Sequence, residues 1–206
     1  MTNLIIIEGP DGAGKTTLAN HLADAPAPDI HVRHPHTRKA THLERLHSAL
    51  ELTSPHSWHA AKRARRQGAF SPRSRLVVTD RYEVVSDTVY SQVFGRAGTW
   101  NQDDVYGWLL ELRWDVVVIQ CKGNPDKPPP APTGDETEEE WRRLVHYHPA
   151  VCEAYNNLEI AKWTGLPVLR YDRWNPSERW WRELCATVPL FDTNEARRYF
   201  YDRHVP

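Results

Sequence analysis

The chain has 206 residues, enough for one domain with insertions, and its formal net charge of −1 gives no global attraction for nucleic acid or membrane. Hydrophobic residues make up 40% of the sequence without any run of about 18 apolar residues, so we expect no transmembrane span. Three widely spaced cysteines match neither a disulfide framework nor a zinc site, and no signal-peptide pattern opens the chain, so we expect a cytoplasmic protein.

A short strand followed at once by a glycine-rich turn opens the chain. Residues 4–7 form an apolar, β-branched run, and the segment from Lys15 onward has the spacing of a helix. Between them lies the pattern Gly-x-x-x-x-Gly-Lys-Thr, whose backbone N–H groups and helix dipole suit a phosphate chain. The predicted contacts with the nucleotide are Gly9, Gly12, Ala13, Gly14, Lys15, Thr16 and Thr17, with Lys15 on the outer phosphates and Thr16 on Mg²⁺.

Further strand candidates alternate with helical stretches along the chain. With the first strand they cover residues 4–7, 30–32, 76–79, 116–120 and 168–171. This alternation predicts an α/β fold, with a five-stranded parallel sheet flanked by helices. Ligands of such sheets bind beyond the carboxyl ends of the strands. The candidate functional segments are therefore residues 9–16, 33–38, 80–82, 122–126 and 172–174.

Asp80 and Arg81 come directly after the third predicted strand. Asp80 can hold Mg²⁺ or polarise an attacking oxygen, whereas Arg81 can grip a phosphate through two parallel hydrogen bonds, which a lysine cannot form. The alternative is an Asp-Arg pair with a structural role only. Because the phosphate loop is predicted on a neighbouring strand, we favour the functional interpretation.

Two later segments interrupt the alternation. Residues 122–136 are rich in proline and glycine, Thr137 and Glu140 form a capping-box pattern at the start of a helix, and Pro149 predicts a kink or break in that helix. Too little chain follows for a second domain, so we interpret residues 122–148 as a lid rather than an interdomain linker. Residues 190–206 form a charged and aromatic extension, predicted as an outer helix.

Taken together, these segments resemble the thymidylate kinase family of P-loop nucleoside-monophosphate kinases. The resemblance extends to about Val188, and is carried by the phosphate loop with its Asp11, the Asp-Arg-Tyr run at 80–82, and the segments 33–35, 59–70 and 165–172. It implies a single P-loop kinase domain over residues 1–206, ATP and Mg²⁺ as cofactors, nucleotide substrates and a homodimer. The implied activity is transfer of the γ-phosphoryl group of ATP to dTMP or a related monophosphate.

The resemblance also implies roles for individual side chains. Catalysis falls to Lys15, Asp80, Arg81 and Asp11, with Thr16 and Asp80 on the metal. The implied acceptor contacts are Arg33, Arg63, Arg81, Ser86, Tyr90, Gln92 and Arg96. An arginine such as Arg96 can donate to a carbonyl but cannot accept from an amino group. The acceptor base is therefore expected to be thymine, uracil or guanine rather than adenine, with cytosine left open.

The departures from the family fall on the acceptor base and the lid. His59, beside Trp58, stands where the family has a stacking phenylalanine, and His34 replaces a glutamate. Ser86 lies one position later after the Asp-Arg-Tyr run than the corresponding serine of the family. The cations near the lid are Lys122, Lys127, Arg142 and Arg143.

Three alternatives remain at the level of the sequence. The basic run at residues 62–66 contains Arg63, and can instead be a nucleic-acid patch or a solvated helix face, although the net charge argues against broad nucleic-acid binding. A kinase of nucleosides or other small hydroxyl compounds would need a general base, for which Glu8 is the candidate. An NTP-dependent DNA-processing protein is disfavoured because the fourth strand ends in Gln120 and Cys121 rather than in acidic residues.

Overall fold

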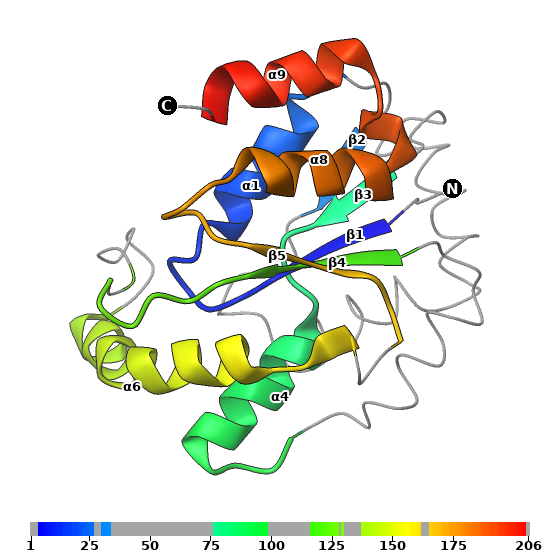
Figure 1. Ribbon diagram of the computed structural model, residues 1–206. Coiled ribbons are helices and arrows are strands. Elements are labelled where there is room, and N and C mark those ends of the chain that lie inside the picture. Colours follow the sequence, from blue (N-terminus) through cyan, green and yellow to red (C-terminus); the bar gives the residue numbers. More distant parts are fainter. Residues whose placement is uncertain are drawn as a thin grey trace, which may run out of the picture.

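The computed structural model describes residues 4–26, 30–33, 76–98, 116–127, 129, 137–161 and 165–204, and the structural statements below refer to these residues. They form an α/β fold in which helices cover both faces of a parallel sheet (Figure 1). This layered arrangement is the one predicted from the alternation of strands and helices. None of the helices described is long and apolar enough to cross a membrane.

The sheet has the strand order β2-β3-β1-β4-β5, and all of its pairings are parallel. Each strand matches its predicted range to within one residue; the strands are β1 (Leu4–Glu8), β2 (Ile30–Arg33), β3 (Leu76–Thr79), β4 (Val116–Cys121) and β5 (Val168–Tyr171). Because β1 is central and covered on both faces, all five of its residues are buried. The carboxyl end of β1 consequently lies between the ends of β3 and β4.

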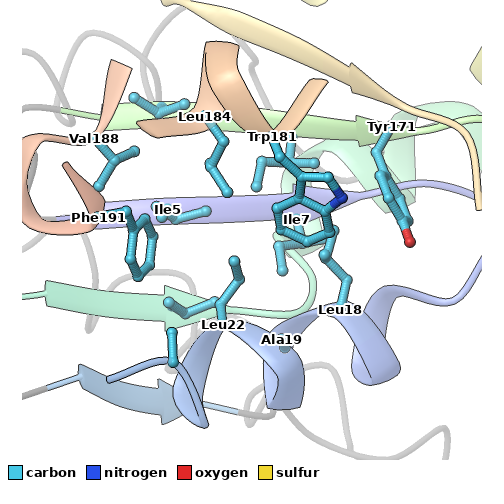
Figure 2. Packing of buried hydrophobic residues seen from close by; sticks show 14 of the residues in the cluster. Ile5, Ile7, Leu18, Ala19, Leu22, Tyr171, Trp181, Leu184, Val188 and Phe191 are labelled. Atoms are coloured by element: carbon cyan, nitrogen blue, oxygen red, sulfur yellow. The ribbon is translucent and has the colours of Figure 1, made fainter. Parts of the chain in front are cut away.

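One face of the sheet is covered by α1 (Lys15–Ala23), α8 (Glu178–Thr187) and α9 (Asn194–His204) (Figure 1). Figure 2 shows Ile7 of β1 beside the Trp181 ring of α8 and Ile5 nearer to Phe191, in the same cluster as the apolar residues of α1. The indole of Trp181 also stacks on Phe200 of α9, with ring centroids 4.5 Å apart. The predicted outer helix of the C-terminal extension is thus α9, which follows the short 3₁₀ helix η1 (Pro189–Phe191).

The opposite face is covered by α4 (Glu83–Phe94) and α6 (Glu138–Asn157) (Figure 1). The predicted capping box of α6 is present, since Thr137 Oγ1 accepts from the Glu140 amide at 3.2 Å and the Glu140 carboxylate accepts from the Thr137 amide at 2.8 Å. Of the kink or break predicted at Pro149, the break is wrong, because α6 continues through this residue. Pro149 has no N–H group, so the carbonyl of Val145, four residues earlier, loses its helical donor.

Candidate active site

The turn between β1 and α1 has a backbone that requires glycine. Gly9, Gly12 and Gly14 have φ angles of 154°, 79° and 84°. A Cβ atom at Gly9 would lie 2.7 Å from the carbonyl oxygen of Cys121, so the loop passes closely over the end of β4. Gly14 precedes α1 without a side-chain cap. The first N–H groups of α1 are therefore available to an anion.

Lys15 lies over this loop rather than in solvent. Its Nζ donates to the carbonyl oxygens of Gly9 and Pro10, both at 2.8 Å, and lies 4.0 Å from Asp11 Oδ1. Burial, followed by the positive charge of Arg81, lowers the pKa of the Lys15 ammonium. From this position the ammonium can exchange two carbonyl oxygens for phosphate oxygens without leaving the loop.

The two predicted metal ligands meet at the start of α1. Thr16 Oγ1 donates to Asp80 Oδ2 at 2.7 Å, across the gap between α1 and the end of β3. Hydroxyl and carboxylate oxygens suit Mg²⁺, which commonly completes its coordination with substrate phosphates and water. The described residues contain no cluster of three His, Cys, Asp or Glu side chains that could hold a metal, so an ion here would need those additional ligands.

Arg81 reaches the phosphate loop through an ion pair with Asp11. The guanidinium Nη2 lies 2.7 Å from Asp11 Oδ1, and Tyr90 Oη of α4 donates to Asp11 Oδ2 at 2.9 Å. Burial alone would lower the pKa of Arg81, but the Asp11 charge and other groups outweigh it and raise that pKa further. The side chains of Arg81 and Asp11 are 25% and 19% exposed, so both remain accessible to a ligand.

Glu8, at the end of β1, is fully buried beneath this ion pair. Its carboxylate accepts hydrogen bonds from the Tyr82 backbone amide, from Ser86 Oγ at 3.3 Å and from Tyr155 Oη at 3.4 Å. Burial raises the pKa of Glu8 to about 7, although Arg81, the Tyr82 amide and Lys15 act in the opposite direction. The carboxylate is thus enclosed by donors from the Asp-Arg-Tyr run, α4 and α6.

The structure gathers some of the predicted acceptor residues and separates others. Ser86 contacts Glu8 and Tyr90 contacts Asp11, as described above. Gln92 is exposed and, two residues beyond Tyr90, lies on a different side of α4. Arg96 follows α4 and pairs with Asp87 at 3.4 Å. No hydrogen bond or ion pair described for either residue reaches Asp11 or Arg81.

Several sequence-based predictions fall on residues that the structure does not describe. The arginine predicted to bind the acceptor, Arg63, lies there with the rest of the basic run, as do His34, Trp58 and His59. The backbone of Arg33 belongs to β2, but its side chain is outside the described part. Their roles stay predictions.

Arg173 and Tyr155 belong to the site and were not singled out from the sequence. Arg173 Nη1 donates to the Gly12 carbonyl at 2.9 Å, and a Cβ atom at Gly14 would lie 3.1 Å from Arg173 Cδ. Arg173 follows β5 within the candidate segment 172–174, so its position after a strand was the available signal. Tyr155 lies within α6, and nothing in its local sequence indicates a hydrogen bond to Glu8.

A small hollow lies beside Asp11, between the phosphate loop, α4 and α6. Aromatic rings of Tyr90 and Phe94 from α4 and Tyr147 from α6 contribute to its lining. The ring centroids of Phe94 and Tyr147 are 5.0 Å apart in an edge-to-face arrangement. The hollow has a volume of about 10 Å³, enough for about one water molecule, so these side chains would have to move for a larger ligand to enter.

Similarity to known proteins is found at the level of structure. No family model matches it, and no curated protein matches it. Among solved structures, it is similar to deoxyadenosine kinase from M. mycoides with bound dATP, with a TM-score of 0.43 and 14% identity, over 89% of this chain and 97% of that one.

Proposed function

We propose that this protein is an ATP-dependent (deoxy)nucleoside monophosphate kinase, similar to thymidylate kinase, with dTMP or a related monophosphate as acceptor. The observation that best supports the proposal is the 2.7 Å contact between Arg81 and Asp11 of the phosphate loop. This contact places a guanidinium beside Lys15, at the carboxyl edge of the sheet. A reaction in which both substrates carry phosphate needs cations for each, and Lys15 and Arg81 supply them.

In the proposed reaction, an oxygen of the acceptor's phosphate attacks the γ-phosphorus of ATP. The bond between that phosphorus and the β–γ bridging oxygen breaks, and ADP leaves with the electron pair. Lys15 and the first amides of α1 hold the donor phosphates, while Arg81 holds the acceptor. Mg²⁺, held by Thr16 and Asp80 when bound, would neutralise charge on the donor phosphates.

The acceptor's chemistry also fits the proposed site. A phosphate monoester has its second pKa near about 6, so at neutral pH its attacking oxygen already carries charge and needs no general base. Asp11 then has the task of orienting Arg81, to which it is paired. On the acceptor side we retain Tyr90, Arg33 and Arg63.

Turnover with a panel of acceptors tests the proposal. The acceptors are dTMP, dUMP, dGMP, dCMP and dAMP, the unphosphorylated nucleosides, and single-stranded DNA as a stimulator of ATP hydrolysis. We expect kcat/KM to be highest for a monophosphate with a carbonyl-bearing base, and at least about 100-fold lower for its nucleoside, because Arg81 then loses its charged partner. If dAMP is the best of the five, the argument from carbonyl recognition is wrong.

Arg81→Ala examines the acceptor site directly. The variant should have a higher KM for the monophosphate and a lower kcat, while the KM for ATP changes by less than about twofold. Arg179→Ala is the matched control, because the Arg179 side chain is 87% exposed on α8 and pairs only with its helix neighbour Glu183 among the ion pairs described. Normal phosphorylation by Arg81→Ala would contradict the monophosphate assignment.

A kinase of nucleosides or other small hydroxyl compounds is the second candidate. Its support is Glu8, whose pKa of about 7 suits a general base. Against it stands the burial of this carboxylate, which already accepts three hydrogen bonds within the protein. A clear preference for nucleosides over their monophosphates in the panel would favour this candidate.

A further inference from the structure

The peptide group that joins Arg81 to Tyr82 is held from both sides by buried side chains. Thr79 Oγ1 donates to the Arg81 carbonyl oxygen at 2.9 Å, and the Glu8 carboxylate accepts from the Tyr82 amide. Thr79 and Glu8 are both 0% exposed. Because a peptide group is planar, fixing its oxygen and its nitrogen fixes the direction in which the chain leaves the Arg81 Cα atom.

The Glu8 carboxylate is itself held in place by the two helices on that face of the sheet. Its second oxygen accepts from Ser86 Oγ of α4 and Tyr155 Oη of α6, whose own oxygens lie 3.3 Å apart. Arg81 and Lys15 are the positive charges that act on it. The side chain that bonds the Arg81–Tyr82 peptide thus belongs to β1 and is itself fixed by hydrogen bonds from α4 and α6.

We infer that Glu8 is a positioning residue which, together with Thr79, holds the Arg81–Tyr82 peptide so that the Arg81 guanidinium meets the phosphate of the acceptor. The inference rests on the proposed function in assigning a phosphate-bearing acceptor to Arg81. The role requires an oxygen that accepts from the Tyr82 amide and does not require a base. Glutamine supplies such an oxygen, whereas alanine does not.

Two pairs of variants test the inference in steady-state kinetics with dTMP and MgATP. Glu8→Gln and Thr79→Ser keep the two hydrogen bonds, and should retain kcat/KM for dTMP within about threefold. Glu8→Ala and Thr79→Val each remove one bond to the same peptide, and should lower that kcat/KM by about tenfold or more. The KM for ATP should change by less than about twofold in all four, because Lys15 and α1 are untouched.

The outcomes separate a positioning residue from a general base. A loss of about 100-fold or more in Glu8→Gln would show that the carboxylate acts as a base, and would overturn the inference. Wild-type kinetics in Thr79→Val would overturn it as well. If Glu8→Ala does not fold, the Thr79 pair decides, since valine and threonine have nearly the same shape.

Hydrogen exchange at the Tyr82 amide gives a readout that does not depend on kinase activity. Exchange should be slow in the wild type and in Glu8→Gln, and faster by about tenfold or more in Glu8→Ala, which leaves this amide without its acceptor. Unchanged exchange in Glu8→Ala would overturn the inference. If no monophosphate is phosphorylated by the wild type, the proposed function fails, and the exchange rates still decide whether Glu8 holds this peptide.

Discussion

Replacing Glu8 by glutamine should change the pH dependence of protein stability. The Glu8 side chain is fully buried, and burial raises its pKa from 4.5 to about 7. In the unfolded chain, the group returns to a pKa of about 4.3–4.5. Between these values the folded protein keeps a proton that the unfolded chain has released. The contribution of Glu8 to the free energy of unfolding therefore falls as the pH rises.

The size of the effect follows from the shift. A change from 4.5 to about 7, at about 1.36 kcal/mol per pKa unit, corresponds to roughly 3 kcal/mol. This stability is fully present below about pH 4.5 and is lost as the pH rises through about 7. Glutamine does not titrate, so the free energy of unfolding of the wild type minus that of Glu8→Gln should fall by about 3 kcal/mol across this interval.

Urea unfolding followed by tryptophan fluorescence, at half-unit steps from about pH 4.5 to about pH 8, measures this difference. Subtracting the two curves removes the contributions of groups that titrate alike in both proteins. Glu139→Gln, at an exposed position in the first turn of α6, is the control for removing one carboxylate. A difference that stays constant within about 1 kcal/mol, or that rises with pH, would refute the reasoning.

Three further predictions concern the loop and the core. Lys15→Ala should lower kcat by about 10²–10³ without unfolding the protein, because in the proposed function the ammonium neutralises charge that grows in the transition state. A loss below about tenfold in a turnover assay would contradict the phosphate-loop assignment. Gly9→Ala should cost about 2–4 kcal/mol of unfolding free energy, since its Cβ would lie 2.7 Å from a Cys121 oxygen. Gly165→Ala is the control, with a φ of 67° but nothing within 4 Å, and should cost about 1 kcal/mol; equal costs in urea unfolding would refute the steric argument. Trp181→Ala should cost about 3–5 kcal/mol by the same measurement, because it empties a buried site, and a cost near zero would refute its place in the core.

The elements with local signals could be predicted from the sequence. Consecutive apolar, β-branched residues predict the buried strand before Gly9. The spacing of Thr137 and Glu140 predicts the capping box of α6. The signal for the predicted phosphate loop is equally local, because its glycines and Lys15 lie within one short segment. Parallel strand order then brings Asp80 and Arg81 to the same edge of the sheet.

The contacts across the site could not be predicted in this way. Tyr155 meets Glu8, and Arg173 meets Gly12, only because α6 and β5 return to the end of β1 in the folded chain. The placement of Gln92, in contrast, follows from local geometry. A helix turns by about 200° over two residues, so Gln92 and Tyr90 cannot share a face. Helical geometry alone would have separated these two predicted contacts.

The order in which the ribosome makes these parts has a consequence for the nascent chain. Tyr155 follows Glu8 by 147 residues, and Arg173 follows Gly12 by 161. At a translation rate of about 5–20 residues per second, Arg173 is synthesised roughly 8–30 s after Gly12, whose carbonyl it binds. During that time β1, whose partners β3 and β4 begin at Leu76 and Val116, passes through a period with an unpaired apolar edge. Slow or paused translation before residue 116 should therefore increase aggregation of this protein, whereas a pause after residue 173 should have little effect.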